Sequence, residues 1–254
     1  MTRTALLVVL LFVAPLGCMV AAHHYGGTGA GTGAGRYGST GQAPPAEPGE
    51  AVIQVYAARA ARWRGAFGVH TWFAVKRADE SRYTRLEVIG YRVYYGGRAV
   101  RIRSGTPDGM WFGSYPTLLR EIRGGASVDR MIERLLEAAA RYPWDDTYRV
   151  WPGPNSNTFV AWLARELPEL NLELPAHAIG KDWLPAGRIA ARTPSGRGGQ
   201  LSLGGYAGLL AGIEEGLEVN LLGLSVGVDL VPPALKLPGI GRVGFPDVRR
   251  YDYD

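Results

Sequence analysis

The chain has 254 residues, of which 46% are hydrophobic and 20% are charged, and its formal net charge is +5. This length supports one sizeable core but not several compact domains, because both ends have compositions that contribute little to a core. The single cysteine, Cys18, lies in an apolar leader, which excludes an internal disulfide and a cysteine nucleophile in the body of the chain.

Charge is spread unevenly along the chain. Between residues 51 and 103, Lys and Arg greatly outnumber the acids Asp79, Glu80 and Glu87, whereas residues 204–235 carry acids and no Lys or Arg. A basic half attracts phosphate, anionic lipid or acidic glycan, but strand faces that point to water also carry charge for solubility alone. We favour solubility and expect no nucleic-acid partner, because no nucleic-acid motif accompanies the arginines.

Residues 1–22 have the pattern of a signal peptide or an N-terminal membrane anchor. Arg3 precedes a long apolar stretch, and the stretch ends with the small residues Val20-Ala21-Ala22, as in an export signal. The stretch is near the minimum length of a membrane-spanning helix, so cleavage and retention both stay open. Lipidation at Cys18 ranks below them, because Pro15 stands where a branched aliphatic residue is expected. All three alternatives predict export to the periplasm or cell envelope, with membrane association through the N-terminus.

The remaining chain divides by composition. Residues 23–50 are rich in Gly, Thr, Ala and Pro and almost uncharged, which predicts a disordered tether. His23 and His24 fall in this tether without a third fixed ligand, so we expect no metal and no other cofactor. We expect one α+β domain over residues 51–244 and a C-terminal tail over residues 245–254.

The first half of the body predicts a β-meander of strands separated by turn signals. Its expected strands cover residues 52–56, 67–75, 83–95 and 98–103. Apolar residues at helical spacing then predict a helix from Ser127 that ends before Pro143. A short strand is expected over residues 148–151, and a second helix over residues 157–167.

The second half gives weaker signals. Residues 200–203 predict a strand, and residues 217–230 predict either a strand pair or an apolar surface lying on a membrane. From Val231 onward, prolines and glycines predict a tail that wraps the surface or is disordered. The expected fold is therefore α+β, with a mostly antiparallel sheet packed against two or more helices.

Ser156 is the candidate nucleophile. Pro152-Gly153-Pro154 predicts a turn, and Asn155 is a favourable N-cap for the helix that follows. A side chain in the first helical turn lies near free backbone N–H groups that stabilise negative charge. The helix N-terminus could then stabilise an oxyanion, with Asn155 or Asn157 as the side-chain donor; we take Asn155 as the candidate. The alternative is that Asn155 and Ser156 only cap the helix.

His70 is the candidate base, because a serine needs a base within hydrogen-bond reach. Strand alternation places His70 on one face with Trp72 and Ala74. A histidine beside a tryptophan is otherwise a packed core residue. Glu87, on the next predicted strand, is the candidate carboxylate that orients the His70 ring.

Several short motifs occur together in this chain. They include Trp63-Arg64-Gly65, His70-Thr71-Trp72, Glu87-Val88-Ile89-Gly90 and the run over residues 151–159. Further motifs lie at residues 53–59, 179–182, 214–223 and 235–239. Together these motifs resemble an uncharacterised bacterial family, domain of unknown function 3750, over roughly residues 52–244. The resemblance implies no activity, because the family has none assigned.

The order of the two candidate motifs resembles a second group of proteins. His70-Thr71 on a strand, followed by Asn155-Ser156-Asn157 opening a helix, is similar to circularly permuted papain-like enzymes of the PPPDE and lecithin–retinol acyltransferase types. This resemblance implies a permuted papain-like fold in which His70 is the base. Ser156 stands where those enzymes carry cysteine. Phe159 matches their aromatic residue, and Thr158 replaces a histidine of the PPPDE pattern.

The leading hypothesis is a cell-envelope hydrolase or acyltransferase that acts on an amide or ester, with His70, Ser156, Glu87 and Asn155 as its site. The alternative is a catalytically inactive papain-like binding module for a peptide, lipid or glycan of the envelope. A membrane-surface scaffold that uses the Gly/Leu-rich C-terminal region is the third hypothesis.

Overall fold

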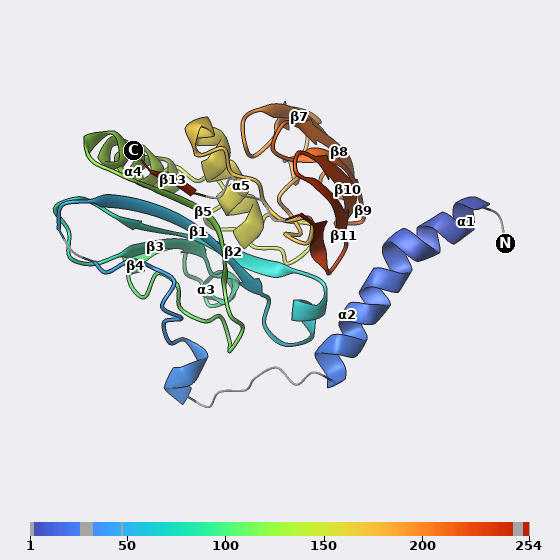
Figure 1. Ribbon diagram of the computed structural model, residues 1–254, viewed down its shortest axis with the longest axis horizontal. Coiled ribbons are helices and arrows are strands. Elements are labelled where there is room, and N and C mark those ends of the chain that lie inside the picture. The colour runs from blue at the N-terminus through green and yellow to red at the C-terminus, as the bar shows by residue number, and fades with distance from the viewer. Residues whose placement is uncertain (1–2, 26–32, 47, 246–250, 254) are drawn as a thin grey trace.

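The computed structural model describes residues 3–25, 33–46, 48–245 and 251–253 (Figure 1). The fold is α+β, with two largely antiparallel sheets and a few helices. The predicted leader, tether and tail also include residues 1–2, 26–32, 47, 246–250 and 254, which lie outside the described residues.

The first sheet has six strands in the order β13-β5-β1-β2-β3-β4. Its strands are β1 (Ala51–Arg59), β2 (Val69–Lys76), β3 (Thr84–Val88), β4 (Val100–Ser104), β5 (Thr117–Gly124) and β13 (Tyr251–Tyr253). The first four form the predicted antiparallel meander. β5 returns to the other edge of β1, and β13 pairs with β5 in parallel.

The strand expected over residues 83–95 is shorter than predicted. β3 ends at Val88, and the chain turns into the short helix α3 (Gly90–Tyr94). A Cβ at Gly90 would lie 2.3 Å from Cε1 of Tyr148, so only glycine allows this close approach. The strand expected over residues 148–151 is absent, since this segment is irregular.

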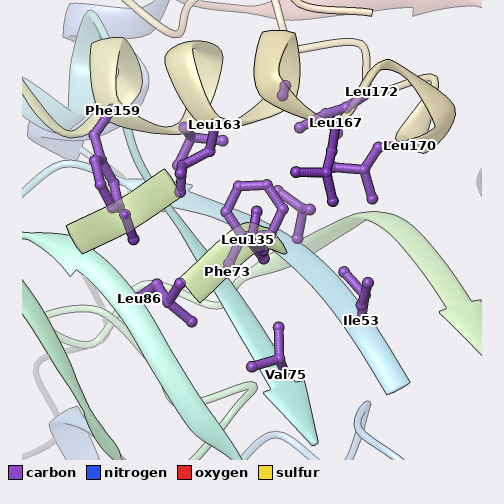
Figure 2. Close-up of a cluster of buried hydrophobic side chains, with 14 of the residues drawn as sticks. Ile53, Phe73, Val75, Leu86, Leu135, Phe159, Leu163, Leu167, Leu170 and Leu172 are labelled. Atoms are coloured by element: carbon purple, nitrogen blue, oxygen red, sulfur yellow. The ribbon is translucent and has the colours of Figure 1, made fainter. Parts of the chain in front are cut away.

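Two helices cover one face of the six-stranded sheet. They are α4 (Ala126–Ala140) and α5 (Ser156–Glu166), close to the predicted ranges. Figure 2 shows Phe159 and Leu163 of α5 facing Phe73 of β2 across this core. Full burial of each such side chain contributes about 1.5–3 kcal/mol, so this core fixes α5 on the sheet.

The second sheet is a seven-stranded meander in the order β12-β11-β10-β9-β8-β7-β6. Its strands are β6 (Ala190–Arg192), β7 (Gly198–Ser202), β8 (Ala207–Gly212), β9 (Gly216–Leu221), β10 (Leu224–Leu230), β11 (Pro233–Leu237) and β12 (Gly241–Gly244). The strand pair over residues 217–230 is confirmed. The tail expected from Val231 instead forms β11 and β12, because their backbones pair with β10 and with each other.

The N-terminal region is helical and lies on the side of the molecule that carries the second sheet (Figure 1). It consists of α1 (Arg3–Val8), the π-helical turn η1 (Val9–Val13) and α2 (Ala14–Tyr25), and α2 packs against the 3₁₀ turn η3 (Arg62–Ala66). None of the helices in the described ranges is both long and apolar enough to cross a membrane.

The segment expected as a disordered tether has defined contacts in its second half. Ser39 Oγ donates to Asp108 Oδ1 at 2.8 Å, and the backbone N–H of Gln42 donates to Asp108 Oδ2 at 2.7 Å. Ala43 and Ala46 pack against the core cluster on the sheet face opposite α5. These donors satisfy the buried Asp108 carboxylate, which would otherwise lack hydrogen-bond partners.

Candidate functional site

The N-terminus of α5 lies against an open edge of β2. β2 pairs with β3 only through Phe73–Val75, so its first residues leave backbone groups for other partners. Asn157 occupies this edge: its Nδ2 donates to Val69 O at 3.0 Å, and its Oδ1 accepts from Thr71 Oγ1 at 3.0 Å. These bonds satisfy polar groups that burial would otherwise leave without partners. They fix the start of α5 beside His70.

Asn155 is the N-cap of α5. Its Oδ1 accepts from the N–H groups of Asn157 at 2.9 Å and Thr158 at 3.2 Å, and Thr158 Oγ1 accepts from the Asn155 N–H. This is a reciprocal capping box. Asn155 Nδ2 also donates to the carbonyls of Val150 and Ile179, each at 3.0 Å. Asn155 was predicted to donate to an oxyanion, but both protons of its Nδ2 are already used in these structural hydrogen bonds.

Two glycines make this arrangement possible. Gly153 has φ +139°, and a Cβ there would lie 2.8 Å from Thr158 Oγ1. Gly180 has φ +96°, and its Cβ would lie 2.5 Å from Asn155 Nδ2. Both positions combine a backbone conformation that favours glycine with a close neighbour. The turn before α5 and the loop behind it are thus shaped around the capping box.

His70 is buried and enclosed by aromatic rings. Its ring stacks on Trp111 with centroids 3.9 Å apart and also on Trp72 with centroids 5.7 Å apart. His70 Nε2 lies 3.2 Å from Glu87 Oε2, as strand adjacency suggested. Burial lowers the pKa of His70 below 6.5, although the hydrogen bond and the charge of Glu87 act in the opposite direction. The imidazole is therefore neutral at pH 7.

Glu87 is an ionised carboxylate in the interior of the sheet. Arg101 donates to its Oε1 from Nη2 at 2.5 Å and from Nε at 3.2 Å, and Arg85 Nη2 donates to Oε2 at 3.1 Å. Burial alone would raise the pKa of Glu87, but the hydrogen bond with His70 and the charges of Arg85 and Arg101 lower it to about 2. An ionised Glu87 accepts the Nε2 proton of His70, so Nδ1 carries the lone pair.

Ser156 is the first residue of α5 and is only 5% exposed. Its backbone N–H lies in the first helical turn, where N–H groups lack helical acceptors. Within the described part of the chain, Ser156 Oγ makes no hydrogen bond, and none joins it to His70. His70 shares the sheet face of Trp72, whereas Thr71 faces α5. The structure thus brings the two residues to one edge of β2 without a direct bond.

His70 and Ser156 nevertheless line the same cavity, whose volume is about 840 Å³. Asn155 and Asn157 also border it, but most of its wall is apolar. The aromatic part of the wall consists of Trp63, Phe67, Tyr91, Tyr94, Trp111, Phe112, Tyr148 and Trp151. The cavity can therefore accept a largely apolar group next to a neutral imidazole and a serine hydroxyl.

Several residues of the site were not predicted. Arg85 and Arg101 had a sequence signal, because Arg85 is two positions from Glu87 on one strand and Arg101 is its partner across β3 and β4. Trp111 had no sequence signal of this kind, because it reaches His70 from an irregular segment after β4. In the described ranges, no group of three or more His, Cys, Asp or Glu side chains is arranged to hold a metal ion.

One family model matches the chain, over residues 50–183. The matched range includes β1 to β5, both large helices and all four predicted site residues, whereas the second sheet lies beyond it. No curated protein and no solved structure matches the chain. Since the match covers more than half of its length, the chain belongs to the family described as Protein of unknown function (DUF3750).

Proposed function

We propose that the cavity shared by Ser156 and His70 is the active site of a cell-envelope hydrolase or acyltransferase that acts on an ester or amide. One observation carries the proposal: a neutral His70, held through Nε2 by an ionised Glu87, lines the same cavity as Ser156. Neutral imidazole is the form that accepts a proton. The apolar wall favours substrates whose acyl or leaving group is apolar.

The reaction follows from these groups. Ser156 Oγ attacks the carbonyl carbon, and its proton passes to His70 Nδ1. The backbone N–H of Ser156 donates to the resulting oxyanion at the start of α5. His70 then gives the proton to the departing alcohol or amine, which leaves an acyl ester on Ser156. Attack by water completes hydrolysis, whereas attack by a second alcohol or amine completes acyl transfer.

The mechanism requires Ser156 Oγ to come within hydrogen-bond range of His70 Nδ1 when substrate is bound. Catalytic hydrogen bonds of empty sites are often long and shorten in the complex. A permuted papain-like arrangement is part of the proposal. It is supported by a histidine on an antiparallel strand and a serine that opens a helix packed on the same sheet.

Labelling by a fluorophosphonate tests the nucleophile. The wild type is expected to be labelled, and Ser156→Ala is expected to abolish labelling. Ser104→Ala, at an exposed position of β4, is the matched control and should be labelled normally. Labelling that survives Ser156→Ala would exclude this site.

A thiol variant tests the role of His70 independently of substrate. In a Cys18→Ser background, Ser156→Cys should react with iodoacetamide faster at pH 7 than Ser104→Cys does, because a neighbouring base promotes the thiolate. Adding His70→Gln should remove this advantage. Equal rates with and without His70 would contradict its role as a base.

The second candidate is an inactive binding module with the same cavity. It is favoured by the amide of Asn155, which is fully used, and by the absence of a bond between His70 and Ser156 in the described residues. It predicts no fluorophosphonate labelling of the wild type. Binding of a fluorescent fatty acid should survive Ser156→Ala and be lost in Leu224→Trp, which fills the cavity.

We also propose that residues 1–22 direct the protein to the cell envelope. The proposal is supported by Arg3 and the apolar stretch that follows it. Fusion of alkaline phosphatase after Asp254 should give activity in intact cells, and deletion of residues 1–22 should abolish it. Equal activity of both fusions would contradict export by this segment.

A further inference from the structure

The second sheet has its apolar side chains on the outside. In β9, Leu217 and Val219 are 47% and 48% exposed, whereas Glu218 and Asn220 are buried. A strand at the surface of a soluble domain normally shows the opposite alternation. The pattern is therefore inverted in β9.

The inversion extends across neighbouring strands. Leu201 pairs with Leu209, and Leu209 pairs with Val219. A second row runs from Leu217 through Val228 to Leu235. All six side chains are at least 37% exposed. We call the surface formed by these six residues the apolar ladder face.

Charged groups on the inner side hold the sheet in this orientation. Lys236 Nζ lies 3.0 Å from Glu218 Oε1 and 3.1 Å from Asp229 Oδ1, and Lys181 forms an ion pair with Glu218 from the other side. These groups are almost completely buried. A shift in register by one residue would expose the ion pairs and bury the ladder, so the observed orientation is strongly specified.

The exposed charged side chains on the second sheet are basic. Between residues 186 and 245 the acids are Glu214, Glu215, Glu218 and Asp229, and all four are buried. Arg188 and Arg192, at the β6 edge, are exposed. The exterior of the sheet therefore combines leucine and valine side chains with arginines at its margin, which complements an anionic lipid surface.

A second apolar element lies next to this surface. η1 approaches β10, and Leu10 and Val13 of η1 are 54% and 55% exposed. Figure 1 shows the N-terminal helices on the side of the molecule that carries the second sheet. A bilayer extends over both elements and would cover more exposed apolar surface than the apolar ladder face offers alone, which favours a bilayer over a compact partner.

We propose that the apolar ladder face docks onto the surface of an anionic lipid bilayer. Leucine and valine side chains enter the boundary between headgroups and acyl chains, and Arg188 and Arg192 contact lipid phosphates. This binding is independent of any chemistry at Ser156.

Flotation of the full-length protein with phosphatidylcholine vesicles that contain phosphatidylglycerol tests the proposal. Leu217→Glu with Leu235→Glu should lower the partition coefficient about tenfold or more, because two partly inserted side chains are replaced by charges. Ile102→Glu is the matched control, because Ile102 is 41% exposed on the other sheet, and it should bind as the wild type does. Arg188→Gln with Arg192→Gln should reduce the preference for vesicles that contain phosphatidylglycerol.

A labelled variant keeps the test valid if the double glutamate variant does not fold. In a Cys18→Ser background, an environment-sensitive dye on Leu217→Cys should brighten and shift to the blue with anionic vesicles, whereas the same dye on Ile102→Cys should not. Unchanged emission at Leu217→Cys would overturn the proposal. A dimer that Leu217→Glu with Leu235→Glu dissociates, without vesicle binding by the wild type, would assign the face to a second copy instead.

Discussion

Glu87 Oε2 lies 3.2 Å from His70 Nε2 inside a sheet, and this pair determines the chemical state of the candidate base. The carboxylate is fully buried, yet Arg85 and Arg101 keep it ionised. It therefore accepts the His70 proton on one nitrogen and leaves the other nitrogen basic.

Glu87→Gln is expected to destabilise the fold by about 3 kcal/mol, because it leaves two largely buried arginines without their counter-charge. It should also slow fluorophosphonate labelling, because glutamine does not hold the His70 tautomer. Urea unfolding and labelling rates measure the two effects. Glu133→Gln, which removes an exposed ion pair with Arg77, should leave the unfolding midpoint unchanged. A stable Glu87→Gln variant with normal labelling would contradict both roles.

Gly180→Ala tests whether the capping box shapes the site. Its Cβ would lie 2.5 Å from Asn155 Nδ2, whereas a Cβ at Gly187 would meet no atom within 4 Å. Both glycines have positive φ, so both substitutions carry a backbone cost of about 1–2 kcal/mol. Gly180→Ala should lower the free energy of unfolding by about 1–2 kcal/mol more than Gly187→Ala does, because it also disturbs the Asn155 N-cap. Equal free energies of unfolding for the two variants would show that Asn155 moves away from the added Cβ without destabilising the fold.

Local sequence patterns were sufficient for the elements that carry the site. The apolar spacing after Ser127 predicted α4, and Asn155 followed by an apolar face predicted α5. Strand adjacency placed Glu87 beside His70. These predictions succeeded because helix caps, helical periodicity and neighbouring meander strands depend on nearby residues.

Features that depend on distant residues were not predictable. β5 pairs with β1 across more than fifty residues, and Trp111 stacks on His70 from an irregular segment. The second sheet was incompletely predicted because its buried face is polar, so Glu218 and Lys236 occupy positions where a core pattern requires apolar residues. Sequence periodicity alone does not distinguish this inverted alternation from an ordinary surface strand.

Acid is expected to destabilise the fold through His177. Burial first, and then the charges of Arg59 and Lys181, lower the pKa of His177 to about 3. The neutral His177 ring therefore contributes fully to the free energy of unfolding above the ordinary histidine pKa of about 6.5. This contribution is lost as the pH falls from there towards 3. Asp182 acts oppositely: burial raises its pKa to about 6, so its contribution is present below about 3.8 and is lost as the pH rises through 6.

A comparison with His177→Leu separates these two effects. The variant also removes Nδ1 of His177, a buried nitrogen without a hydrogen-bond partner among the described residues. Its free energy of unfolding should fall less steeply than that of the wild type between pH 6.5 and 4, by at most about 1.4 kcal/mol per pH unit. Parallel pH profiles from urea unfolding would show that His177 is protonated in the folded protein.

The pH dependence of fluorophosphonate labelling tests His70 as the base. Burial lowers the pKa of His70 below 6.5 despite the opposing effect of Glu87, so the ring is neutral at pH 7 and above. Labelling should remain nearly constant from pH 8 to 7 and decrease at lower pH, as protonation removes the lone pair on Nδ1. In Glu87→Gln the acid decrease should begin at still lower pH, because the charge that favours imidazolium is gone. A decrease that begins above pH 7 in the wild type would assign the titrating group to a residue other than His70.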